Sequence, residues 1–269
     1  MSSTRGRPKR LIHDHFGLQD IIDELDKPAE LVERDFALVS IAAQLVVDYG
    51  DALCFKGGFV LRHVYGHERL SKDIDATRRE PPKHKFDAEE IASSVRSASM
   101  GDLLSIEPGQ PKTDSGRSLD FASVAYKGPL STGHLALEIS YREAVVEPPD
   151  IVEIGPPYYE PFEIPVMVIN EIVAEKLRTL CQRTRPTDLS DLAMIFGAQA
   201  ERLDDGVIRS IAEKKFEIVA GGNRLARIEA NIEIMGVDYA RTVFEVAPDA
   251  PSYEDARETV LRRIRRLVP

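Results

Sequence analysis

Two aspartates separated by a single residue, Asp73 and Asp75, have the spacing best suited to binding a metal ion. Alternate residues of a β-strand point to the same face, so a strand at this position would present both carboxylates together. Paired carboxylates hold the hard, oxygen-preferring cations that phosphate chemistry needs. Acidic pairs are common in acidic chains, however, and are usually solvated, so this pair alone is weak support for a site.

The apolar run 53–56 comes shortly before these aspartates and leads into Gly57 and Gly58. We interpret it as a strand, followed by a helix that the glycine pair opens and by a second strand that carries the aspartates. Glycines let the backbone approach a phosphate, and a helix N-terminus offers free N–H groups to it. A glycine pair alone is more often a turn. Both patterns within one strand–helix–strand unit favour a site for a nucleotide and a metal ion.

These residues resemble the signature of the AbiEii/AbiGii toxin family of nucleotidyltransferases, a glycine pair with Thr or Ser followed by Arg-x-Ser-x-Asp-Ile-Asp. Residues 170–178, followed by Asp188 and Asp191, are similar to the second block of that family. The chain departs from the pattern at Phe59, where the family usually has a hydroxyl residue, and at Thr187, where it usually has arginine. The resemblance covers roughly residues 53–196. The matching positions of the first block are Gly57, Gly58, Arg62, Arg69, Ser71, Asp73 and Asp75.

The resemblance implies an α+β fold of the polymerase-β-like nucleotidyltransferase kind, with a mixed sheet, flanking helices and a C-terminal helical bundle. We expect a basic N-terminal segment over 1–27, a nucleotidyltransferase core over 28–169 and a helical domain over 170–269 that completes the active site. The implied reaction moves a nucleoside monophosphate from a nucleoside triphosphate to an acceptor hydroxyl, with Mg²⁺ or Mn²⁺ as cofactor. The 3′ end of tRNA is the expected acceptor, and a cognate antitoxin is the expected protein partner.

The resemblance also implies a role for each matching residue. Asp73 and Asp75 would hold the metal ion with Glu138 as a third acid, and Lys176 and Asp188 would complete the catalytic set. Because Phe59 can offer only its backbone N–H to a phosphate, we expect weak triphosphate affinity. The residues expected to bind the nucleotide are Gly57, Gly58, Phe59, Arg62, Arg69, Ser71 and Lys176.

Several of these residues also have an ordinary structural interpretation. Glu138 is either the third acid or an exposed strand glutamate that shares a face with Ala136 and Ser140. Lys176 lies at the edge of an apolar helix stripe, from which lysines more often extend to solvent than bind a ligand. Arg69 either assists the nucleotide or braces its loop.

Asp188 and Asp191 share a helix face at i and i+3, in a first turn where the helix dipole alone favours acids. Asn170 is expected to cap the preceding helix, with Glu171 in its first turn, and Glu175 to form a surface ion pair with Arg178. The buried stripe of that helix would comprise Ile172, Val173, Leu177 and Leu180.

Apolar periodicity and turn residues predict the remaining elements. Helices are expected over 28–49, 86–97, 206–220, 223–235, 237–247 and 252–267, and strands over 53–56, 103–107, 119–126, 134–141 and 164–169. The last helix would begin with a capping box formed by Ser252 and Asp255.

Composition favours a cytoplasmic protein with no membrane partner. The 269 residues include only two cysteines, and the sequence has neither a bilayer-spanning apolar run nor a signal peptide. The net charge of −10 argues against a uniformly basic nucleic-acid-binding surface. Basic clusters nevertheless occur at residues 5–10 and 262–266, and either could contact RNA. The first could instead be a disordered basic tail, and the second could instead stabilise the C-terminal end of a helix.

Three other functions remain open at this point. The enzyme could modify a small molecule, or it could transfer nucleotides to a protein side chain. It could also be a binding module of the same fold that has lost catalysis. RNA binding would weaken steeply with added salt, whereas a small-molecule site would respond little.

Overall fold

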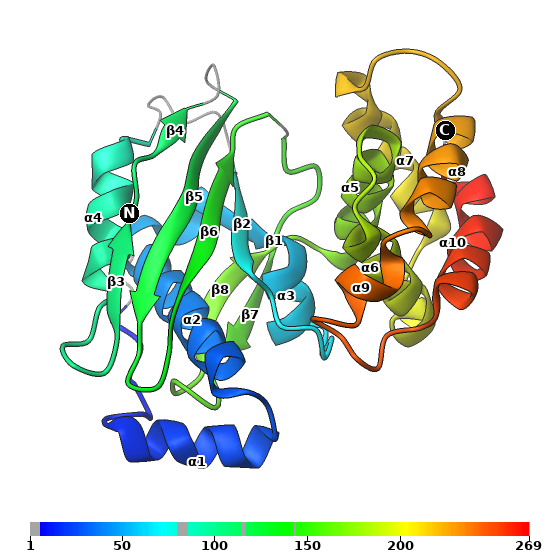
Figure 1. Ribbon diagram of the computed structural model, residues 1–269. Coiled ribbons are helices and arrows are strands. Elements are labelled where there is room, and N and C mark those ends of the chain that lie inside the picture. The colour runs from blue at the N-terminus through cyan, green and yellow to red at the C-terminus, as the bar shows by residue number, and fades with distance from the viewer. Residues whose placement is uncertain (1–5, 80–85, 114–116, 143, 269) are drawn as a thin grey trace. The chain divides into compact units, whose positions relative to one another are not determined.

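The computed structural model describes residues 6–79, 86–113, 117–142 and 144–268, which form two compact units. Unit 1 holds the chain up to residue 66 together with residues 70–145 and 149–166 (Figure 1). Unit 2 holds residues 167–269 and two short segments, 67–69 and 146–148. Within the described ranges, no helix is long and apolar enough to cross a membrane.

Unit 1 is built on an eight-stranded mixed sheet with the strand order β3-β5-β6-β2-β1-β8-β7, and β4 pairs with β5. The pairs β2/β6 and β1/β8 are parallel and the other pairs are antiparallel. The strands are β1 (Leu53–Lys56), β2 (Asp73–Arg78), β3 (Ser105–Pro108), β4 (Lys112–Thr113), β5 (Ser118–Lys127), β6 (Thr132–Ser140), β7 (Asp150–Ile154) and β8 (Phe162–Val166).

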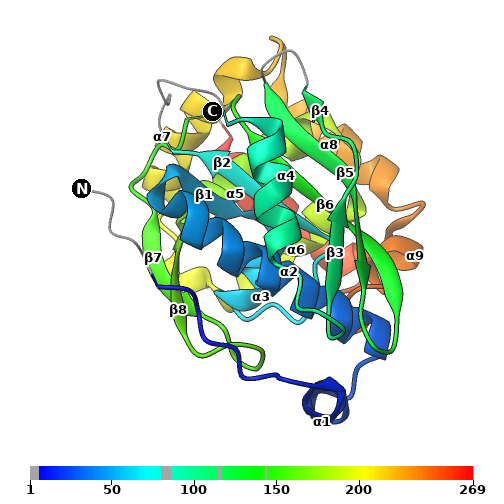
Figure 2. The same ribbon diagram turned by 90° about the vertical axis from the view of Figure 1, so that its left-hand side faces the viewer.

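Four helices belong to unit 1: α1 (His15–Leu25), α2 (Ala29–Tyr49), α3 (Gly57–His63) and α4 (Ala88–Ser97). Figures 1 and 2 both show α2 and α4 along the same face of the sheet. Helix α2 packs on β6 and β2, and it contributes wholly buried residues such as Phe36 and Ile41 to the core. A mixed sheet with covering helices confirms the predicted α+β class.

Unit 2 is helical. Its helices are α5 (Ile169–Gln182), α6 (Pro186–Ala198), α7 (Asp205–Lys215), α8 (Arg224–Met235), α9 (Tyr239–Val243) and α10 (Tyr253–Leu267). Helix α5 packs against α6, α7 and α8, and α6 packs in turn against α9 and α10. The predicted stripe of α5 is buried, and Ser252 and Asp255 form the predicted capping box.

The structure corrects several local predictions in unit 1. Residues 1–27 are not only a basic segment, because Asp14 caps helix α1 and Leu18, Ile21 and Ile22 bury its inner side. Strand β7 was not predicted, and β8 lies a few residues earlier than expected. A short strand with an exposed face, such as β7, carries little apolar alternation from which to predict it.

Two predictions for α5 are corrected, and the predicted place of Glu171 in its first turn is confirmed with an addition. Asn170 is not the cap, because the carbonyl of Val168 already accepts the first helical hydrogen bonds; Asn170 Oδ1 instead accepts from the N–H of Asp204 (3.1 Å). Glu171 is fully buried, where Lys215 Nζ lies 2.7 Å from it, so it does more than balance the helix dipole. The pair of Glu175 and Arg178 (3.9 Å) is largely buried and not on the surface.

Candidate active site

Strand β1 passes directly into α3, and the turn between them is built around Gly57. Gly57 has φ +70°, a left-handed conformation that residues with side chains rarely adopt. A Cβ atom on Gly57 would lie 2.3 Å from Oδ2 of Asp75, so no side chain fits there. Lys56 pairs with Asp75 across the two antiparallel strands. The start of α3 and the Asp75 carboxylate are therefore in direct contact.

Asp73 and Asp75 are half-buried and alternate with the buried residues Ile74 and Ala76. Both carboxylates thus lie on one face of β2, as their spacing predicted. The hydroxyl of the buried Ser71 donates to Asp73 Oδ1 (2.9 Å) and to the Asp73 carbonyl oxygen (3.0 Å). This double contact fixes the orientation of the Asp73 carboxylate.

The register of the sheet adds two further acids to the same face. Glu138 of β6 lies opposite Asp75, and Asp120 of β5 lies opposite Glu138. Glu138 is about half-exposed, with Arg142 Nη2 3.7 Å away. Asp120 accepts from the Ser118 hydroxyl at Oδ2 (2.9 Å), while its Oδ1 is buried and has no hydrogen-bond partner within the described residues.

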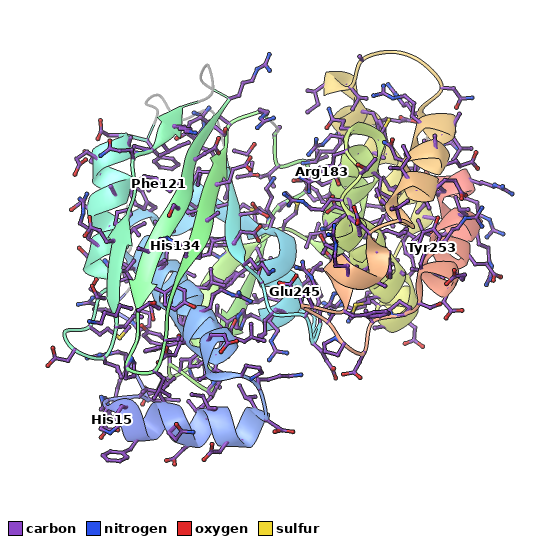
Figure 3. The ribbon with its side chains drawn as sticks, in the orientation of Figure 1. His15, Phe121, His134, Arg183, Glu245 and Tyr253 are labelled. Carbon is purple, nitrogen blue, oxygen red and sulfur yellow. The ribbon has the colours of Figure 1, made fainter. Side chains whose placement is uncertain are left out.

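A second cluster of charged side chains lies inside unit 2. Lys176 Nζ of α5 is 2.8 Å from Asp188 Oδ1 and 2.7 Å from Asp191 Oδ2, both on α6. Arg69 reaches Asp191 through Nε and Nη2, and Arg183, labelled in Figure 3, reaches Asp188 through Nε (2.7 Å). Three cations therefore enclose two buried aspartates.

The pKa shifts in this cluster follow from its geometry. Burial opposes ionisation of Asp188 and Asp191, but Lys176 together with Arg183 and Arg69 outweighs it, and the pKa of each aspartate is lowered. Burial likewise opposes the charge of Lys176, yet the two aspartates raise the pKa of its ammonium. Both acids are therefore ionised and the lysine is protonated at neutral pH.

The sequence profile described as "Nucleotidyl transferase AbiEii toxin, Type IV TA system" matches residues 42–263, which include the site in unit 1 and the cluster in unit 2. This chain belongs to the AbiEii family. It is a nucleotidyltransferase of the toxin type, as the two sequence blocks implied. Family membership makes a nucleoside triphosphate its substrate and an antitoxin its partner.

Solved structures share the fold of this AbiEii-family chain. They include the MenT4 nucleotidyltransferase toxin from Mycobacterium tuberculosis H37Rv (TM-score 0.66, 16% identity, covering 93% of this chain and 89% of that one). A putative nucleotidyltransferase from H. pylori has a TM-score of 0.61 and 19% identity, covering 89% of this chain and 95% of that one. JHP933 from Helicobacter pylori has a TM-score of 0.59 and 19% identity, and the match covers 88% of this chain and 90% of that one. No curated protein sequence matches the chain.

The carboxylate face of this AbiEii-family enzyme has the donor chemistry of a magnesium site. Within the described residues, no three His, Cys, Asp or Glu side chains converge closely enough to form a metal cage. Magnesium does not need one, because it commonly binds through one or two carboxylates and completes its octahedron with water and substrate phosphates. Asp73 and Asp75 fit that arrangement, and the buried Oδ1 of Asp120 is a further oxygen donor nearby.

Three residues expected to bind the nucleotide have other contacts in the structure. The ring of Phe59 is wholly buried, with its centroid 4.7 Å from that of His63 and 6.1 Å from that of Phe55. A hydroxyl at position 59 would therefore lie in the core. It would not be placed to donate a hydrogen bond to a phosphate, which is the role that the family pattern implied for it. Arg62 acts on the buried Asp35: against the effect of burial, His63 and, after it, Arg62 lower the pKa of that carboxyl. Arg69 forms the bracing contact with Asp191 described above.

Sequence reasoning misses one participant, Asp120, and gives the catalytic role to only one member of the pair Asp188 and Asp191. Asp120 carried a usable signal, because Leu119-Asp120-Phe121 repeats the apolar–acid–apolar pattern of Leu137-Glu138-Ile139 on a second strand. Asp191 was recognised, but Asp188 was preferred to it. The structure shows that both aspartates contact Lys176 at equivalent distances.

Proposed function

We propose that this enzyme transfers a nucleoside monophosphate from a nucleoside triphosphate to the 3′-hydroxyl of tRNA. The observation that carries the proposal is the contact between Gly57 and Asp75, which joins a helix N-terminus with phosphate-facing N–H groups to a metal-binding carboxylate. Membership of a nucleotidyl transferase toxin family supports the reaction class. The basic cluster at residues 5–10 supports an RNA acceptor in an otherwise acidic chain. The cluster at 262–266 gives less support, because Arg262, Arg263 and Arg265 pair with acidic residues.

Asp73 and Asp75 would hold Mg²⁺, and Ser71 would keep the Asp73 carboxylate oriented for it. When bound, the ion would neutralise negative charge on the triphosphate and on the pyrophosphate that leaves. Gly57 and Gly58 would let the backbone N–H groups at the start of α3 approach phosphate oxygens. The triphosphate would then be held between these N–H groups and the carboxylates of Asp73 and Asp75.

Glu138 is the residue that we assign to the proton of the attacking hydroxyl. It lies across from Asp75 in the sheet register and is about half-exposed, so an acceptor can reach it. A carboxylate at this position can accept the proton as the new bond to phosphorus forms. Asp120, one strand further along, is the alternative third acid because its Oδ1 is buried without a described partner.

Lys176 would contribute a positive charge to the triphosphate. Asp188 and Asp191 hold its ammonium from two sides, so the side chain is fixed before any substrate binds. Arg69 and Arg183 contact the same two aspartates and help to hold them in place around the lysine. Asp188 and Asp191 would act by positioning the lysine.

The proposal is tested by incubating the purified protein with Mg²⁺, total tRNA and each labelled nucleoside triphosphate in turn. We expect one label to enter RNA, and Asp73→Asn and Asp75→Asn to reduce incorporation by at least about hundredfold without unfolding the protein. Asp150→Asn, at an exposed aspartate at the start of β7, is the matched control. Label that enters the protein or a small molecule instead, or normal transfer by both site variants, would contradict the proposal.

A further inference from the structure

The basic N-terminal segment lines a pocket in unit 1 that shares no residue with the candidate active site. Figure 2 shows this dark blue segment running from the grey terminus past α2 towards α1. It is held by an antiparallel bridge between Arg10 and Tyr159 and by hydrogen bonds between main-chain atoms of Leu11 and Tyr158 (2.9 Å). The pocket beneath it has a volume of about 170 Å³. Its lining includes Arg7, Arg10, Ser40, Gln44, Met100 and Tyr159.

The charged residues that line this pocket are all positive. Two arginines line it and no acidic residue does, although the whole chain carries a net charge of −10. The nearby carboxylate of Asp48 is already engaged by Gln44 Nε2 (3.0 Å) and by Ser94 Oγ (2.5 Å). An anion in the pocket would therefore meet positive charge without a competing carboxylate among the lining residues.

The two arginines differ in what they already contact. Arg7 Nη2 donates to Gln44 Oε1 (3.1 Å) and to the carbonyl of Ser97 (2.9 Å), which leaves its Nε and Nη1 for a ligand. The guanidinium of Arg10 forms no hydrogen bond or ion pair with any residue that the structure describes, although it is half-buried. Both guanidinium groups act on the buried hydroxyl of Tyr159, partly offsetting the rise in its pKa that burial causes.

The floor of the pocket is rigid and already hydrogen-bonded. Tyr159 Oη donates to Ser40 Oγ (3.1 Å), and Ser40 Oγ donates to the carbonyl of Phe36 (2.7 Å). The donors that remain for a ligand are therefore mainly those of the two arginines. Guanidinium groups pair with phosphate oxygens through parallel hydrogen bonds, which makes a phosphate the ligand that best suits this donor set.

We propose that this pocket binds a backbone phosphate of the RNA substrate through Arg7 and Arg10, at a position separate from the nucleotidyl-transfer site. The inference rests on the proposed function in taking RNA as the acceptor. Arg7 and Arg10 line the same pocket, and this favours a polyanion over a single free phosphate, because adjacent phosphates can occupy the two charges. The pocket would thus anchor RNA without touching the reacting atoms.

The experiment compares the binding of tRNA to the full-length wild type, Arg10→Gln, Arg7→Gln/Arg10→Gln and Lys9→Gln across a series of NaCl concentrations. Lys9→Gln is the matched control, because it removes the same charge from the same segment, whereas Lys9 is paired with Glu160 (2.5 Å) and does not line the pocket. We expect Arg10→Gln to weaken binding about tenfold and to reduce the salt slope by about one. Melting temperatures verify that each variant folds.

Equal weakening by all three variants would show diffuse attraction to the basic segment and overturn the proposal, as would no change in any of them. Poly-glutamate that competes as well as RNA of equal charge would also overturn it, because the site would then lack preference for phosphate. A titration with inorganic phosphate, monitored by protection of Arg10 from an arginine-selective reagent, separates this inference from the proposed function. Protection of Arg10 by phosphate in a protein that binds no tRNA would refute the RNA acceptor and leave a phosphate pocket. Protection of Arg10 by neither phosphate nor tRNA would refute the pocket and leave the proposed function to the incorporation assay.

Discussion

Gly57 and Asp75 approach so closely that a Cβ atom on the glycine would lie 2.3 Å from Oδ2 of the aspartate. The contact joins the start of a helix to one of the paired carboxylates, so the backbone expected to face phosphate and the expected metal ligand cannot move independently. Glycine is required for a second reason, since φ is +70°. Disturbing this one position should therefore disturb both parts of the proposed site.

Gly57→Ala should abolish transfer, because the methyl group must displace the Asp75 carboxylate. Gly66→Ala is the matched control, since Gly66 has nearly the same φ (+71°) but open space around its Cβ position. Both variants should lose about 1–2 kcal/mol of unfolding free energy from the left-handed backbone, and Gly57→Ala should lose more. Denaturant unfolding and label incorporation measure the two effects; equal activity of both variants would show that the close contact does not matter.

Lys176→Met should destabilise the protein by about 3 kcal/mol as well as weaken triphosphate binding. The methionine keeps the packing of the stem but leaves Asp188 and Asp191 without the ammonium between them, and unpaired buried charges are costly. Arg183→Gln, at a half-exposed partner of Asp188, should cost less than about 1 kcal/mol. Unfolding free energies compare the two variants. A Lys176→Met protein as stable as the wild type would mean that this ion cluster contributes nothing to folding.

The lowered pKa of Asp188 predicts a specific dependence of stability on acid. Since the folded-state pKa is below the ordinary value for an aspartate, this stabilisation is fully present well above pH 4 and is lost as the pH falls towards the folded pKa. Asp188→Asn should therefore be less stable than the wild type at pH 7, and the difference should shrink at acid pH by up to about 1.4 kcal/mol per pH unit. Unfolding free energies between pH 7 and 3 test this. A difference that stays constant over that range would refute the assigned ionisation.

Phe59→Ser should destabilise unit 1 by about 3–5 kcal/mol and should not tighten triphosphate binding. The ring is fully buried beside Phe55 and His63, so its removal opens a cavity in the core. Phe59→Leu fills most of that space and should cost distinctly less. Equilibrium unfolding and triphosphate titration would separate the outcomes; a stable Phe59→Ser variant that binds triphosphate more tightly would restore a role for a hydroxyl at this position.

Local sequence determined the unit that carries the paired carboxylates. The strand over 53–56, the helix that begins at Gly57 and the common face of Asp73 and Asp75 follow from periodicity and from the backbone freedom of glycine, which act over a few residues. The buried stripe of α5 follows for the same reason.

Tertiary structure decided which distant residues join that unit. A strand period of two shows that Glu138 and Asp120 each face one side, but only the pairing of β2 with β6 places Glu138 beside Asp75, and only the pairing of β6 with β5 places Asp120 beside Glu138. Likewise, helical spacing placed Lys176 at the edge of a core, while the packing of α5 on α6 enclosed its ammonium between two aspartates. Periodicity reports the orientation of a residue within its own element; which element lies opposite depends on long-range packing, which no local pattern contains.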